Sequence, residues 1–197
     1  RRHHGGEVLR AGGPGLEEAR RRDPPSPPGD LLVQPHPPPA PQLGGTLEND
    51  SADKAARFVN LCDAFGIPLL FLQDVPGFMV GSKVEHAGII RHGAKMLYAV
   101  SRATVPKVTV VVRKAYGAGY YVMNGKAYEP DLIVAWPTAE ISVMGPEGAV
   151  NIIGRSAIEA SEDPDATREA MLNAVREQID PYIAAGNALI DDVIDPR

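Results

Sequence analysis

The chain has 197 residues, 44% of them hydrophobic, and a formal net charge of −5 at pH 7. This length usually forms one domain with a workable core, and the acidic balance excludes nucleic acid as the main partner, because phosphate binding needs a basic surface. The single cysteine, Cys62, excludes a disulfide framework and fits a reducing cytoplasm. No apolar run approaches the roughly 20 residues of a membrane span, so we expect no signal peptide and no membrane partner.

The first 43 residues differ from the rest. They hold ten of the 19 prolines and six arginines, and they contain no aromatic residue. Proline lacks a backbone donor and fixes φ, so the runs PPSPPGD and PHPPPAPQ cannot form helix interiors or central strands. We expect a disordered tail over residues 1–43 and a folded domain over residues 44–197. A second hypothesis is that residues 1–43 are the product of GC-rich coding DNA translated in the wrong reading frame.

From Gly44 onward, segments with helical periodicity alternate with short apolar runs. The run PLLFLQD shows no alternation, as in a strand covered on both faces. Strands that alternate with helices predict an α/β architecture. Helices are expected over 54–65, 84–103, 117–124, 145–154 and 163–185, and strands over 68–74, 105–113, 131–136 and 140–144. The inward positions expected on the two longest helices are Ile89, Ile90, Ala94, Leu97 and Val100, and then Met171, Val175, Ile179 and Ile183.

The stretch Gly117-Ala118-Gly119 leaves a buried strand and opens a helix. The first amides of a helix lack intrahelical partners, and the aligned peptide dipoles add positive potential there. Two such amides can form an oxyanion hole, worth about 3 to 4 kcal/mol per donor where charge develops. Close packing of the helix on the strand explains the glycines equally well, since short glycine motifs have many false positives.

Two further strand ends have the same character. In Asp74–Phe78, a Pro-Gly pair favours a tight turn that could present Phe78 as an apolar wall. In Ser142–Gly148, a strand is again followed by a glycine and a new helix. Each could be an ordinary connection, but three such ends in one domain predict a shared ligand edge. His86 and His92 are not spaced as metal ligands, so no metal site is expected.

Three runs together resemble the carboxyltransferase (beta) subunit of biotin-dependent acyl-CoA carboxylases, of the propionyl-, acetyl- and methylcrotonyl-CoA carboxylase type. The first is GTLENDSADKAARFVNLCDAFGIPLLFLQDVPGFMVGSKVEHAGIIRHGAKMLYAVSRATVPKVTVVVRKAYGAGYYVMNG, followed by ISVMGPEGAVNII and YIAAGNALIDDVIDPR. The resemblance covers residues 44–197, corresponds to the C-terminal half of that subunit, and includes none of residues 1–43.

The resemblance implies a crotonase or ClpP-like fold, a spiral of ββα units. It also implies transfer of a carboxyl group from carboxybiotin to the α-carbon of an acyl-CoA. The backbone amides of Ala118 and Gly119 would then hold the ureido oxygen of biotin, and Tyr121 would occupy a position that influences acyl choice. The residues implied to line the biotin channel are Pro76, Gly77, Phe78, Gly117, Tyr120, Met144 and Gly145.

The same resemblance implies biotin carried on a partner protein or domain, a biotin carboxylase or carrier subunit, an acyl-CoA substrate and a homo-oligomer. From the resemblance we expect these 197 residues to lack the acyl-CoA domain of the family and to end earlier than family members usually do. We therefore keep a second hypothesis, a catalytically inactive fragment or assembly unit. A third, a crotonase-type hydratase or decarboxylase, is disfavoured by the specific runs ENDSADKAARF and IIRHGAKML.

Overall fold

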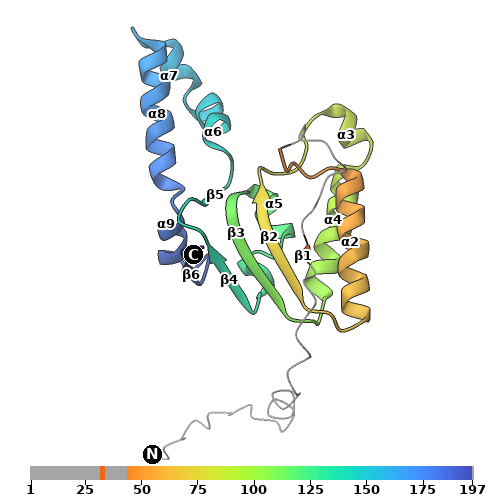
Figure 1. The fold of residues 1–197 in the computed structure, drawn as a ribbon. Helices are drawn as coiled ribbons and strands as arrows, with labels where there is room; N and C mark the ends of the chain where they lie inside the picture. Colours follow the sequence, from red (N-terminus) through yellow and green to blue (C-terminus); the bar gives the residue numbers. More distant parts are fainter. Residues whose placement is uncertain (1–31, 34–43, 197) are drawn as a thin grey trace, which may run out of the picture. The chain divides into compact units, whose positions relative to one another are not determined.

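The computed structural model describes residues 32–33 and 44–196, and within them one parallel sheet forms the centre of the fold (Figure 1). The strand order is β1-β2-β3-β4-β6, and β5 pairs with β3. The long strand β3 pairs first with β4 and then, nearer its C-terminal end, with β5. The predicted α/β architecture is confirmed. The strands are β1 (Leu32–Val33), β2 (Leu69–Val75), β3 (Lys107–Tyr116), β4 (Leu132–Ala135), β5 (Glu140–Ser142) and β6 (Asp192–Val193).

Helices α2 and α4 cover one face of the sheet (Figure 1), and their apolar residues pack on β2 around Phe71. A second core cluster joins β3 and β4 to α9 through Val111, Ile133 and Ala184. The helices are α2 (Asn49–Ala64), α3 (Ser82–His86), α4 (Ile89–Arg102), α5 (Gly117–Val122), the 3-10 turn η2 (Lys126–Tyr128), α6 (Pro146–Ile153), α7 (Arg155–Glu159), α8 (Pro164–Gln178) and α9 (Pro181–Gly186).

Strand β2 was expected to be covered on both faces, and it is covered more fully on one face than on the other. Its residues alternate between buried and half-buried positions, although the first four of them are all apolar. The buried series runs through Leu69, Phe71, Gln73 and Val75, and this side faces the helices. Burial therefore follows the two-residue period of the strand, which the apolar run Leu69–Leu72 does not reveal.

The helix predicted over 84–103 is two helices. Gly88 adopts a left-handed conformation with φ 89°, and this residue separates α3 from α4. The buried face of α4 runs through Ile89, Gly93, Met96 and Val100, so two expected inward positions lie off it: Ile90 is 82% exposed and Ala94 is exposed. Ile89 and Val100 are buried as expected, and Leu97 is half-buried.

The helix predicted over 163–185 is also divided. Helix α8 ends at Gln178, and α9 begins at Pro181, where the Asp180 carboxylate accepts a hydrogen bond from the Tyr182 N–H. A proline lacks the N–H that a continuous helix would need, so the helix restarts there. Of the predicted stripe, Ile179 is buried, but Ile183 is 45% exposed.

The region predicted as a disordered tail contains one described element. Leu32 and Val33 form β1, which pairs in parallel with Leu70 and Phe71 at the edge of the sheet. The rest of residues 1–43 lies outside the described residues. The domain boundary at residue 43 therefore stays a prediction.

The Asp63 carboxylate, at the end of α2, accepts hydrogen bonds from the residues just before β3. Asp63 Oδ1 accepts hydrogen bonds from the Thr104 N–H at 2.6 Å, the Thr104 hydroxyl at 3.0 Å and the Val105 N–H at 3.2 Å. These bonds, the Thr104 N–H first, lower the pKa of Asp63. A carboxyl whose pKa is lowered by folding stabilises the fold above its unfolded pKa of about 3.9 and loses that effect as pH falls through the folded value.

Asp63→Ala is therefore expected to lower the free energy of unfolding at pH 7 more than at an acidic pH below the lowered pKa of Asp63, because the wild-type carboxylate is protonated there. Urea midpoints at both pH values measure this. The exposed Glu177→Ala on α8 is the control, with little effect at either pH. An equal loss at both pH values would contradict the role of the ionised carboxylate.

Candidate functional site

The predicted strand ends after β3 and after β5 meet at two glycines. Gly117 has φ 53°, and a Cβ on it would lie 2.8 Å from the Val143 carbonyl oxygen. A Cβ on Gly145 would lie 3.1 Å from the ring of Tyr116. The left-handed conformation and the close backbone contact both require glycine at position 117.

The strand end after β2 packs on the same turn. A Cβ on Gly119 would lie 2.9 Å from Val75 Cγ2 and 3.3 Å from the Cα of Gly77. Close packing therefore explains the glycine at 119 by itself. All three strand ends that the sequence singled out come together at this edge of the sheet.

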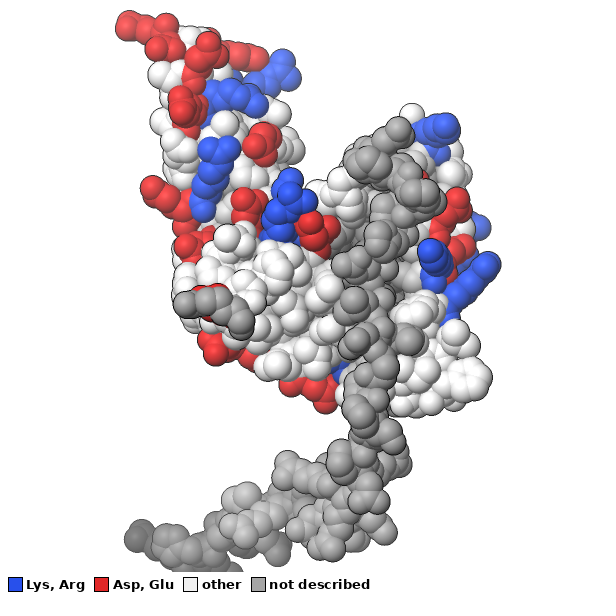
Figure 2. Space-filling model, viewed as in Figure 1, with Lys and Arg blue, Asp and Glu red and all other residues white. Residues whose placement is uncertain are grey.

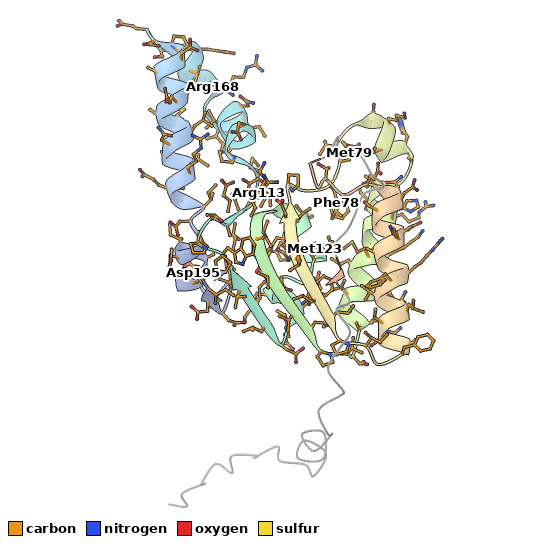
Figure 3. The ribbon with its side chains drawn as sticks, viewed as in Figure 1. Phe78, Met79, Arg113, Met123, Arg168 and Asp195 are labelled. Carbon is orange, nitrogen blue, oxygen red and sulfur yellow. The ribbon has the colours of Figure 1, made fainter. Side chains whose placement is uncertain are left out.

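The loop after β2 is fixed by backbone pairing. The Leu47 N–H donates to the Gly77 carbonyl at 2.9 Å, and the Met79 N–H donates to the Leu47 carbonyl at 2.7 Å. Phe78 then lies beside α4, where a Cβ on Gly93 would meet its ring at 3.0 Å. Figure 3 shows Phe78 above the end of the sheet, next to that helix. Phe78 forms an apolar wall, as the sequence predicted.

The first turn of α5 leaves main-chain donors free. Within residues 32–33 and 44–196, no hydrogen-bond acceptor is found for the N–H groups of Ala118 and Gly119. Ala118 is exposed, whereas Gly119 is buried beneath the loop. The two predicted donors thus differ in access, and Ala118 is the one at the surface.

Two cavities meet at Ala118. The larger has a volume of about 860 Å³ and lies between α5, the chain after β5, and the helices α6 and α8. The smaller has a volume of about 350 Å³ and lies between α4, α5 and Phe78. The larger is lined by Gly117, Ala118, Tyr120, Tyr121, Ile141, Ser142, Val143, Met144, Ala149, Ile153, Val175, Gln178, Ile179 and Leu189. The smaller is lined by Phe78, Ile89, Ile90, Gly93, Ala94, Leu97, Ala118 and Val122.

The predicted site residues divide between these walls. Gly117, Tyr120, Tyr121 and Met144 line the larger cavity, Phe78 lines the smaller and Ala118 lines both. Pro76, Gly77, Gly119 and Gly145 line neither of the two, although the last three pack against residues of the same turn. Ile90 and Ala94 were expected to face the core, but they are exposed and line the smaller cavity.

Neither cavity wall, as the described residues form it, carries an Asp, Glu, His, Lys or Arg side chain. Tyr116 lies just before α5, and its hydroxyl donates to Glu140. Burial, and then the bond to Glu140, raises the pKa of Tyr116. Burial also raises the pKa of Tyr120, whose hydroxyl donates to the Leu189 carbonyl at 2.6 Å. Both tyrosines are therefore neutral donors, and neither is a ready base.

Charged groups lie outside these walls. Near the carboxyl ends of β2 and β3, the Arg113 guanidinium forms a bidentate ion pair with the Asp74 carboxylate, with N···O distances of 2.8 to 3.1 Å. Figure 2 shows acidic and basic side chains interspersed over α7 and α8, and uncharged residues over much of the surface below them. The site is therefore suited to an uncharged ligand group that accepts hydrogen bonds.

Residues 32–33 and 44–196 contain no group of three or more His, Cys, Asp or Glu side chains able to hold a metal ion. Among the helices of this described part, none has the length and apolar character to cross a bilayer.

Gly117→Ala tests the turn that presents these amides. We expect it to lower the free energy of unfolding by more than about 1 kcal/mol, because a left-handed non-glycine residue is strained and its Cβ would meet the Val143 oxygen. Gly148→Ala in α6 is the matched control, since a Cβ there meets nothing within 4 Å. It should stabilise by about 0.5 to 1 kcal/mol. Urea unfolding of both variants checks this, and equal effects would contradict the strained turn.

Fold and site together define an α/β domain in which three strand ends meet beside two cavities. The sequence profile of the Carboxyl transferase domain matches residues 20–197, and the chain belongs to that family. The match begins within the proline-rich segment, earlier than residue 44, where the resemblance was expected to start.

Two curated relatives illustrate the similarity. A propionyl-CoA carboxylase carboxyltransferase subunit of Haloferax mediterranei is 55% identical over 153 residues, which is 77% of this chain and 30% of the relative. The methylmalonyl-CoA carboxyltransferase 12S subunit of Propionibacterium freudenreichii subsp. shermanii is 54% identical over 155 residues, 78% of this chain and 30% of the relative. The chain thus spans about 30% of the length of these relatives.

Solved structures agree. The transcarboxylase 12S structure, described as a hexamer assembly with methylmalonyl-coenzyme A and methylmalonic acid bound, superposes with a TM-score of 0.73 at 54% identity, covering 79% of this chain and 30% of that one. The beta subunit of P. aeruginosa geranyl-CoA carboxylase gives a TM-score of 0.70 at 36% identity, covering 77% and 30%. These carboxyltransferases have the crotonase-like fold, which confirms the predicted fold class.

Proposed function

We propose that this chain is the biotin-side domain of a carboxyltransferase that moves a carboxyl group from carboxybiotin to the α-carbon of an acyl-CoA. The observation that carries the proposal is Ala118, an exposed residue that lines both cavities and whose N–H has no acceptor among the described residues. Family membership supplies the reaction class, and the site supplies a place for it.

The residues present fit the bicyclic ring of biotin. The ring is compact and uncharged, and its ureido oxygen is a hydrogen-bond acceptor. The larger cavity, at about 860 Å³, is within the usual range for small-molecule sites, and its walls are apolar with a few hydroxyl and amide groups. Biotin carried on a partner would enter here as a substrate of the domain.

In this proposal the Ala118 and Gly119 N–H groups donate to the ureido oxygen where negative charge develops as the carboxyl group leaves. Donors fixed in the main chain need no reorganisation, so each contributes about 3 to 4 kcal/mol to the transition state. The apolar walls exclude water and strengthen these bonds. Biotin supplies the carboxyl group and a basic ureido nitrogen, which accounts for a site without an acid–base side chain.

Tyr121 is the proposed contact for the acyl group. It is 48% exposed, lines the larger cavity and lies edge-on to Tyr120, with ring centroids 5.4 Å apart. A bulky ring at this place would restrict the space beside the amides. The acyl-CoA chosen is therefore proposed to depend on the size of residue 121.

The proposed partners are a biotin carboxylase or biotin carrier subunit, an acyl-CoA and further copies of the carboxyltransferase. Several large apolar side chains support burial by a partner, among them Val80 at 83% exposure and Val143 and Ile153 at 81% each. The related 12S protein is described as a hexamer and a multienzyme core. We propose a cytoplasmic setting, which the free buried thiol of Cys62 supports.

One observation favours a second candidate, an inactive fragment or assembly unit: the chain spans only about 30% of its relatives. Biotin-dependent decarboxylation of methylmalonyl-CoA by this chain alone separates the two. Measurable turnover supports the enzyme, and its absence together with intact biotin binding supports the assembly unit.

Titration with biotin methyl ester, followed by ¹H–¹⁵N NMR, tests the site directly. We expect saturable shifts of the Ala118 and Gly119 amides and no shift of Phe65, which is 73% exposed on the surface. Methyl valerate, which lacks the ureido ring, is the control and should leave these amides unchanged. Biotin-induced shifts confined to other regions would refute the proposed site.

A further inference from the structure

A buried polar cluster lies under α5 and takes no part in either cavity wall. Gln73 comes from β2, Thr109 from β3, and Asn124 follows α5. All three side chains are fully buried, at 0% exposure. A buried polar side chain costs about 1 to 3 kcal/mol unless it is hydrogen-bonded, so such a cluster calls for a role.

Gln73 connects the sheet to the C-terminal end of α5. Its Nε2 donates to the Met123 carbonyl at 2.6 Å and to the Tyr120 carbonyl at 3.1 Å. These are carbonyls of the last turn, where a helix leaves acceptors without partners. Met123 itself lies between the sheet and helices α2 and α4 (Figure 3). One side chain thus holds two carbonyls at the buried end of the helix.

Thr109 provides a second connection, from the neighbouring strand. Its hydroxyl donates to the Asn124 carbonyl at 3.1 Å and accepts from the Asn124 side-chain amide at 2.9 Å. Asn124 has φ 63°, a left-handed conformation that ends the helical segment. The chain after α5 is therefore fixed to β3, as the helix end is fixed to β2.

Helix α5 needs such connections because it has only six residues. A helix this short does not hold its own geometry in water and depends on tertiary contacts. At 1.5 Å per residue it is about 9 Å long, so a tilt of about 10° at its buried end would move its first amides by roughly 1.5 Å. Functional groups must be placed to within about 0.5 Å of their working geometry, and a displacement of roughly 1.5 Å exceeds that tolerance.

Packing alone does not explain glutamine at position 73. Methionine or leucine would fill a similar volume without a buried polar group. Moreover, Gln73 Oε1 and Asn124 Oδ1 find no hydrogen-bond partner among the described residues. The glutamine is thus only half satisfied, so its two donated bonds must account for its presence.

We propose that Gln73 is a positioning residue, which fixes the direction of α5 and thereby the placement of the Ala118 and Gly119 amides. Its two bonds act at one end of the helix, and the amides lie at the other. That these amides serve biotin rests on the function proposed above; that Gln73 orders them does not.

Backbone order measured by ¹⁵N relaxation on the 197-residue chain tests the proposal. In the wild type, the Ala118 and Gly119 amides should be rigid, with order parameters near 0.85; in Gln73→Met they should fall below about 0.6. Ser101→Ala, which removes an exposed hydroxyl bonded to the Tyr98 carbonyl, is the control and should leave them rigid. A lower melting temperature in Gln73→Met with unchanged amides would overturn the proposal.

Gln73→Glu supplies a readout that a purely structural role would not move. When protonated, the carboxylic acid can donate one bond to the helix carbonyls; when ionised, it repels them. Burial raises the pKa of such a carboxyl above its ordinary value of about 4.3. The amides should therefore be ordered at low pH and lose order as pH rises through that pKa. Order that does not change with pH would overturn the proposal, even where Gln73→Met fails to fold.

The two proposals fail separately. If the amides lose order in Gln73→Met but biotin methyl ester does not shift them in the wild type, the positioning role holds and the biotin site is wrong. If biotin shifts them in the wild type and Gln73→Met leaves them rigid, the site holds and the positioning role is wrong.

Discussion

Ala118→Pro is expected to lower biotin-dependent carboxyl transfer at least about 100-fold, which is the usual effect of removing one oxyanion donor. Proline deletes the N–H at 118 but is tolerated in the first turn of a helix. Ala118 is exposed, so the ring has room. The melting temperature should change little. Decarboxylation of methylmalonyl-CoA with free biotin measures turnover, and calorimetry measures stability.

Ala118→Gly is the matched control, because it keeps the N–H and should retain turnover near wild type. Gly119→Pro should also lower turnover by at least about 100-fold, but less cleanly, since its side chain would meet Val75. If the chain alone proves inactive, loss of the biotin-induced shift at Gly119 in Ala118→Pro reports the same donor. Unchanged turnover or unchanged biotin binding in Ala118→Pro would show that the Ala118 N–H is not a donor to the ligand.

Phe71→Ala is expected to destabilise the fold by about 3 to 5 kcal/mol, because it removes a large side chain from the core and leaves a cavity. Phe71 is fully buried on β2, at 0% exposure, and packs in the cluster formed with α2 and α4. Urea unfolding, with midpoint and slope both fitted, measures the loss.

Phe65→Ala supplies the comparison within the same residue type. Phe65 is 73% exposed at the end of α2, so its loss should change stability by less than about 0.5 kcal/mol. A Phe71→Ala effect below about 1 kcal/mol would show that the described core is not the one that holds the sheet together.

Local sequence patterns predicted which segments form helices and strands, but they predicted less accurately the residues at which these helices begin and end. The strand before Gly117 and the helix after it follow from an apolar run and a glycine turn, and both are found. The breaks at Gly88 and Pro181 were missed because apolar periodicity continues across each. Glycine and proline commonly interrupt helices, and in the structure both residues do so although the apolar periodicity continues.

Gln73 shows where a sequence signal was present but unused. It lies in the buried series of β2, two residues after Phe71, and a polar residue at such a position indicates a hydrogen-bonding role. Which groups it bonds could not be predicted, since Met123 is 50 residues away along the chain.

The sequence by itself determined the family, the α/β class and the three glycine-bearing strand ends, because periodicity, turn chemistry and motif order are local properties of the chain. Only the tertiary structure decided that these ends meet, that Ala118 is exposed while Gly119 is buried, and that Gln73 donates to carbonyls at the end of α5. Those facts depend on distances between residues remote in sequence, which packing of the sheet against its helices fixes.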